Sequence, residues 1–174
     1  MRTVLSSLES EYRRYQRLGD ESIRQLDAEA LVRQPPGDGN SVAALVWHVA
    51  GNLRSRFTDF LTTDGEKPWR DRESEFAARA VSVADVRAKW EEGWNVLFQT
   101  LSTLSDGDLS RSVVIRGQPL SVLDALQRSV THASYHVGQI VFLARSLRGK
   151  RWEWLTIPPG RSEAYNRDPD REKP

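Results

Sequence analysis

Apolar residues recur at intervals of three and four in four long stretches of the sequence, and this periodicity constrains the fold more than any other feature. The stretches cover residues 4–18, 42–60, 82–104 and 121–147 of the 174-residue chain. Each reads as an amphipathic helix, which must bury its apolar stripe against a partner. Four such helices in one chain of this length predict an all-α fold, a four-helix bundle.

The residues between the stretches support this division. The segment QPPGDGN contains two prolines and two glycines, which cannot continue a helix. Ser82 with Asp85, and Ser121 with Asp124, have capping-box spacing and predict the first turns of the third and fourth helices. The segment SVVIRGQPL (112–120) combines β-branched residues with a glycine, and it predicts a short extended hairpin before the last helix.

The chain is expected to form one domain over residues 1–158, followed by a loosely ordered polar tail over residues 159–174. The tail ends in charged residues and prolines without apolar periodicity. Three apolar residues before it are expected to dock the C-terminal segment on the bundle: Trp152, Trp154 and Leu155.

Composition excludes several classes of function. The formal net charge is +1, which is too small to indicate nucleic-acid binding. Cysteine is absent, which excludes disulfides, cysteine-ligated zinc and a cysteine nucleophile. No stretch approaches the roughly 18 apolar residues of a membrane helix, and the first 20 residues lack the apolar region of a signal peptide. We therefore expect a cytoplasmic protein that binds neither nucleic acid nor membrane.

The three histidines of the chain are the main candidates for chemistry. His132 and His136 are four residues apart, so they lie on one face of the last helix, and His48 is in the second. All three border apolar stripes and should face the bundle interior or a crevice. The pattern favours a divalent-metal site with an open coordination position over three independent half-buried histidines, although it leaves both open.

Two polar residues follow these histidines by about one helical turn. Asn52 follows His48, and Gln139 follows His136. Either could orient a ligating imidazole or a bound water, and a plain role at the rim of a crevice is the alternative.

Other candidates have a competing structural interpretation. Tyr135 could donate a proton or simply pack. Arg54, Arg56 and Arg128 could bind an anionic group or form ordinary ion pairs. Asp64 and Glu66 could add metal ligands or belong to a solvated loop.

The histidine in the second predicted helix, together with THASYHVGQIVFLAR in the last, resembles the DinB superfamily of YfiT-like metal-dependent proteins. The stretches GDGNSVAALVWHVAGN and WEWLTIPPGRSEAYN are similar to a subgroup described as a domain of unknown function. The resemblance implies that His48, His132 and His136 bind a divalent metal. Three imidazole ligands suit zinc or nickel first, with iron as a further candidate. It also implies a homodimer, because the bundles of this superfamily often pair.

The same resemblance suggests an activity. The superfamily includes S-transferases that use bacillithiol or mycothiol, which implies a metal-dependent enzyme that joins a small thiol to a small-molecule substrate. A hydrolase that uses water activated by the metal is one alternative, although the predicted helices offer no obvious carboxylate as a base. A metal-binding stress-response protein without catalytic activity is another.

Overall fold

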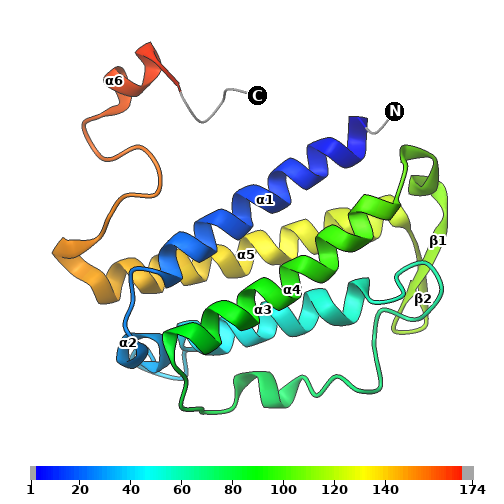
Figure 1. Ribbon diagram of the computed structural model, residues 1–174, viewed down its shortest axis with the longest axis horizontal. Coiled ribbons are helices and arrows are strands. Elements are labelled where there is room, and N and C mark those ends of the chain that lie inside the picture. Colours follow the sequence, from blue (N-terminus) through cyan, green and yellow to red (C-terminus); the bar gives the residue numbers. More distant parts are fainter. Residues whose placement is uncertain (1–2, 170–174) are drawn as a thin grey trace.

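The computed structural model describes residues 3–169, in which four long helices lie side by side as a bundle (Figure 1). These helices are α1 (Thr3–Ile23), α3 (Val42–Phe57), α4 (Val83–Thr103) and α5 (Val122–Arg148). The predicted all-α bundle is therefore confirmed. The shorter elements are α2 (Ala28–Val32), α6 (Ser162–Arg167), the 3₁₀ turns η1 (Glu73–Phe76), η2 (Asp106–Ser110) and η3 (Gly149–Arg151), and the strands β1 (Ser112–Ile115) and β2 (Gln118–Ser121).

Side-chain caps fix where the third and fourth bundle helices begin. Ser82 and Asp85 form a reciprocal capping box at the start of α4. At the start of α5, the hydroxyl of Ser121 accepts a hydrogen bond of 3.0 Å from the backbone N–H of Asp124. Both predicted helix starts are confirmed.

The helix α3 is three residues shorter than its apolar pattern predicts. It ends at Phe57, and Asp59 adopts a positive φ of 49° that no α-helix can contain. Phe60 nevertheless turns back into the core, where it is buried and its ring centroid lies 5.1 Å from that of Phe57. The apolar spacing therefore continues after the helix has ended.

The helix α1 is longer than the first predicted stretch, because it continues through Gly19 to Ile23. A Cβ atom on Gly19 would lie 2.2 Å from the indole ring of Trp90, so only glycine leaves room for that ring. The indole N–H of Trp90 donates a hydrogen bond of 3.2 Å to the backbone carbonyl of Gln16. The glycine that weakens the helical pattern thus makes room for a contact between α1 and α4.

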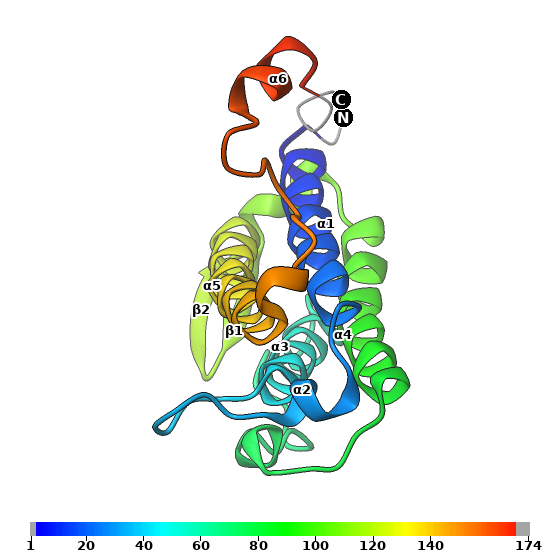
Figure 2. The ribbon, with the colours of Figure 1, turned by 90° about the vertical axis from the view of Figure 1, so that its left-hand side faces the viewer.

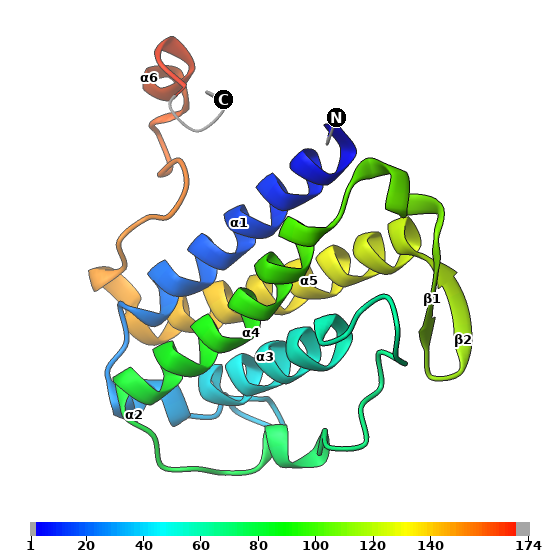
Figure 3. The same cartoon turned by 45° about the vertical axis from the view of Figure 1, so that its right-hand side comes forward.

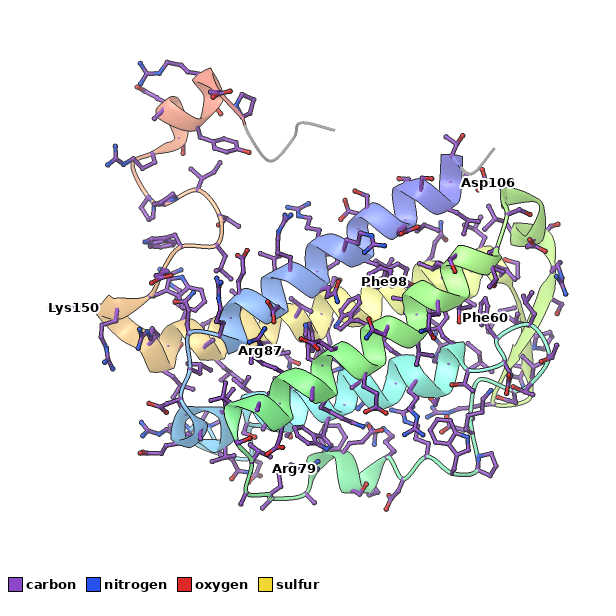
Figure 4. The ribbon with its side chains drawn as sticks, in the orientation of Figure 1. Phe60, Arg79, Arg87, Phe98, Asp106 and Lys150 are labelled. Atoms are coloured by element: carbon purple, nitrogen blue, oxygen red, sulfur yellow. The ribbon has the colours of Figure 1, made fainter. Side chains whose placement is uncertain are left out.

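Contacts distant in sequence hold α1 in the bundle. Asp106 lies beside the first turn of α1 and accepts hydrogen bonds of 3.2 and 3.0 Å from the backbone N–H groups of Val4 and Leu5 (Figure 4). Farther along α1, the buried hydroxyl of Tyr12 donates a hydrogen bond of 2.8 Å to the carbonyl of Leu126 in α5. Asp106 thus satisfies backbone N–H groups that have no partner within the first turn of the helix, and the carbonyl of Leu126 satisfies a buried hydroxyl.

A close approach between α3 and α4 depends on Gly93. A Cβ atom on this glycine would lie 2.5 Å from the Cα atom of Ala50, so the two backbones would have to move apart. We expect Gly93→Ala to lower the free energy of unfolding by about 1–3 kcal/mol. In Gly138→Ala, the new Cβ meets no atom within 4 Å, and we expect a gain of up to about 1 kcal/mol. Urea denaturation measures both changes, and an unchanged midpoint for Gly93→Ala would contradict the close contact.

The predicted hairpin is present, and it anchors the connection between α3 and α4 (Figure 3). Arg116 and Gly117 form its turn, and both have positive φ angles, 54° and 73°. The side chain of Asp64 accepts hydrogen bonds from the backbone N–H groups of both residues, at 2.8 and 2.7 Å. The backbone N–H of Gly65 also donates to the carbonyl of Val114 at 2.8 Å. The start of this connection is thereby tied to the hairpin.

The C-terminal segment leaves the bundle after α5, and α6 stands away from the four helices (Figure 2). Trp152 packs against the core and Leu155 is buried, whereas Trp154 is 39% exposed beneath the guanidinium of Arg145. The end of the predicted loose tail, residues 170–174, lies outside the described residues. No helix within residues 3–169 is long and apolar enough to cross a membrane.

Candidate metal centre

The three histidines meet between α3 and α5. His48 comes from α3, and His132 and His136 lie one turn apart on α5. Their potential ligand nitrogens all lie within 4.8 Å of one another, and the Nε2 atoms of His48 and His132 are 3.3 Å apart. Two nitrogens on one tetrahedral zinc ion would be about 3.4 Å apart. The group could therefore hold a metal ion after side-chain movements of about 1 Å.

The buried carboxylate of Glu75 orients His48. Its Oε2 atom lies 2.9 Å from Nδ1 of His48, and both side chains are almost fully buried. When Nδ1 carries the proton, its N–H donates a hydrogen bond to this carboxylate. The Nε2 atom then keeps a free lone pair that faces His132. This is the arrangement by which carboxylates commonly fix the tautomer and ring orientation of a metal-binding histidine.

Arg70 holds Glu75 in turn. Two of its guanidinium nitrogens donate to the two carboxylate oxygens, at 2.8 and 3.0 Å, and a third donates to the hydroxyl of Ser55 at 3.2 Å. Burial raises the pKa of Glu75, but the hydrogen bonds from His48 and Arg70 and the charge of Arg70 outweigh burial and lower this pKa overall. Glu75 is therefore ionised at neutral pH.

The helix α3 makes room for this carboxylate at Gly51. A Cβ atom on Gly51 would lie 2.1 Å from Oε1 of Glu75. The glycine comes three residues after His48 and lies on the same side of the helix. Sequence reasoning missed both Glu75 and Arg70, because they lie in a connection without apolar periodicity. The one sequence feature that pointed to a close neighbour at this position was the glycine inside α3.

Gln139 orients His136, the second histidine of α5. Its Oε1 atom lies 2.8 Å from Nδ1 of His136, so the amide oxygen accepts that N–H. Asn52, the other predicted orienting residue, lines the pocket beside the histidines. A role for either residue at a bound cofactor stays a prediction.

The environment keeps the two histidines of α5 neutral. Burial, together with the neighbouring His136 and His48, lowers the pKa of His132 to about 3. Burial also lowers the pKa of His136, although the hydrogen bond to Gln139 opposes this effect. Neutral imidazoles are the form that binds metal ions, so no proton has to leave these rings at pH 7.

A pocket of about 460 Å³ opens beside the histidines. It is also lined by Tyr135, Arg56 and Arg128, as well as by apolar side chains of the bundle. The predicted anion-binding residue Arg54 is not among the residues that line it. Its guanidinium instead lies 3.3 Å from Glu92 and 4.6 Å from the centre of the Trp69 ring.

The two acidic residues considered as extra ligands have structural partners. Asp64 binds the hairpin turn, and Glu66 pairs with Arg56 and Arg116 at 3.2 and 2.8 Å. Neither belongs to the histidine group. The structure therefore agrees with the alternative in which these residues belong to the loop, although they bind the hairpin and arginines rather than solvent alone.

Comparison with known proteins identifies the family. No protein with a curated description matches the chain. A family model described as "Protein of unknown function (DUF1572)" matches residues 1–161, which include all three histidines, Glu75 and both helices that carry the site. The chain belongs to the DUF1572 family.

Proposed function

We propose that the protein is a metal-dependent enzyme that transfers a small thiol to an electrophilic substrate. The observation that carries this proposal is the convergence of three imidazoles, one of them braced by a buried carboxylate, at the side of a pocket. A purely structural histidine cluster has no need of an adjoining pocket of this size. The resemblance of the histidine segments to the DinB superfamily supports the choice of thiol chemistry.

The side chains divide the work of such a reaction. Glu75 and Gln139 hold two of the rings through Nδ1, which leaves Nε2 of each ring available for an ion. A divalent ion held there would supply a positive charge that lowers the pKa of a small thiol nearby. The chain contains no cysteine, so the thiol comes from outside.

In this reaction the thiol sulfur forms a bond to an electrophilic carbon of the substrate. The bond from that carbon to its leaving group breaks, and the leaving group departs with the electron pair while the thiol proton passes to solvent. Phe57, Phe60 and Phe76 line the pocket and limit the access of water to it.

Hydrolysis is less well supported. Among the described residues that line the pocket there is no aspartate or glutamate to serve as a general base. Glu75 is close to the histidines, but its oxygens already accept hydrogen bonds from His48 and Arg70.

The test is an assay of zinc- and nickel-loaded protein without a histidine tag. Bacillithiol or mycothiol would be mixed with a chromogenic aryl halide, and formation of the thioether followed by absorbance. We expect turnover that requires the thiol and falls at least about 100-fold in His132→Ala. Rates equal to the uncatalysed reaction in metal-loaded wild type, with every thiol tested, would contradict an enzyme of this class and favour a non-catalytic metal-binding protein.

A further inference from the structure

The pocket beside the histidines has an unusual charge balance. Five arginines line it, Arg56, Arg70, Arg72, Arg116 and Arg128, and no carboxylate is found among its described lining residues. A hollow with low-dielectric walls and charge of one sign concentrates ligands of the opposite sign. The positive charge of these arginines can attract an anionic ligand only where nearby carboxylates do not already neutralise it.

Three of the arginines are paired. Glu66 contacts both Arg56 and Arg116, at 3.2 and 2.8 Å. Arg70 is committed to Glu75 through two hydrogen bonds. These guanidinium groups hold the loop and the carboxylate behind His48, so they are not free to bind a ligand.

The charges of the other two arginines, Arg72 and Arg128, are not neutralised by a buried carboxylate among the described residues. Among the described residues, Arg72 pairs with the carboxylate of its neighbour Glu73 at 3.2 Å, and its guanidinium lies 5.3 Å from the centre of the Phe76 ring. The carboxylate of Glu73 is 87% exposed, so this ion pair is weak. The guanidinium of Arg128 forms no ion pair or hydrogen bond with any residue in the range 3–169. Arg128 also lies one turn before His132 on α5, which places it on the face that carries the histidines.

The remaining walls suggest the rest of the ligand. Phe57, Phe60 and Ile115 provide an apolar surface in the same pocket. A guanidinium binds a carboxylate or phosphate through two parallel hydrogen bonds, and it does so better where apolar walls reduce competition from water.

We propose that the substrate of the pocket carries an oxyanion group on a small apolar body, and that Arg128 binds this group. The inference rests on the proposed function in one respect, because it names the class of molecule that would react beside the metal centre. A carboxylate and a phosphate ester share the required chemistry.

The test uses the full chain, freed of metal by dialysis against a chelator, so that no anion can bind an ion instead of the protein. Benzoate and its neutral analogue benzamide would be titrated into ¹⁵N-labelled protein and followed by NMR. We expect benzoate to bind about tenfold more tightly than benzamide, since a charged hydrogen-bonded pair is worth about one order of magnitude. Phenyl phosphate, as a second anion, shows whether phosphate or carboxylate is preferred.

Two substitutions of Arg128 and one control locate the effect. In Arg128→Gln the preference for benzoate should disappear, and in Arg128→Lys it should be reduced, because the charge remains but the paired donors are lost. Arg17→Gln removes an exposed arginine from α1, away from the pocket, and should leave the preference unchanged. Circular dichroism confirms that the variants are folded.

Equal binding of benzoate and benzamide to wild type, or a preference that survives Arg128→Gln, would overturn the proposal. Its failure is distinct from failure of the proposed function. Anion preference is measured without metal, whereas metal stoichiometry and thiol transfer are measured separately, so either result can be negative while the other stands.

Discussion

Replacing Glu75 with alanine is expected to lower the free energy of unfolding by about 3–5 kcal/mol, because it leaves a buried charge without its partner. The side chain of Arg70 is only 2% exposed, and both of its contacts with a carboxylate are made to Glu75. The same change removes the acceptor for Nδ1 of His48. Urea denaturation of metal-free protein measures the stability loss.

Metal affinity should fall in the same variant. A carboxylate that orients a metal-binding histidine contributes about 10- to 100-fold to affinity, and competition with a chromogenic chelator measures this change. Glu73→Ala is the matched control, because it removes a neighbouring glutamate whose one arginine partner within residues 3–169 is the exposed Arg72. That control should change stability by less than about 1 kcal/mol. Similar losses in the two variants would show that Glu75 has no special role.

The second large effect is expected at the histidines. His132→Ala should lower the affinity for zinc by more than about 100-fold, beyond the range seen for residues that only orient a ligand. His132 is half-buried rather than fully enclosed, so its removal should leave the bundle folded. Gln139→Ala provides the comparison, since Gln139 contacts Nδ1 of His136 and should contribute only about 10- to 100-fold. A His132 variant that binds zinc as tightly as Gln139→Ala would contradict direct ligation by His132.

The bundle and the meeting of the histidines could be predicted from the sequence because both follow from helical periodicity. Residues four apart share a helix face, and apolar stripes must face a common core, so His48 and the pair on α5 were expected to approach one another. The capping pairs at Ser82 and Ser121 fixed two helix starts for the same local reason. Each of these signals lies in residues close in sequence, although the histidines that the two helices bring together are 84 residues apart.

The features that sequence reasoning missed depend on contacts across the chain. Glu75 and Arg70 reach His48 from an aperiodic connection, which the hairpin anchors at Asp64, 11 residues before Glu75. Asp106 caps a helix that begins about 100 residues earlier. Glu75, Arg70 and Asp106 belong to no local sequence motif, because each meets its partner only after the bundle has formed.

The sequence also left two roles open for several arginines, anion binding and ordinary ion pairing. The fold shows a different position for each arginine. Arg54 and Arg128 are both exposed, yet Arg54 pairs with Glu92 on α4 whereas Arg128 lines the pocket. The difference arises from which face of its helix each residue occupies and from what the neighbouring helix offers there. A homodimer, suggested by the resemblance, stays a prediction.

The most direct test of the account is elemental analysis of untagged wild-type protein and of His48→Ala, purified side by side without chelator. His48 is separated from His132 by 84 residues, so loss of metal on its removal would join the two histidine segments into one site. We expect about one divalent ion per chain in wild type and less than about a tenth of that in the variant. Wild-type protein that stays empty after incubation with both zinc and nickel would contradict it.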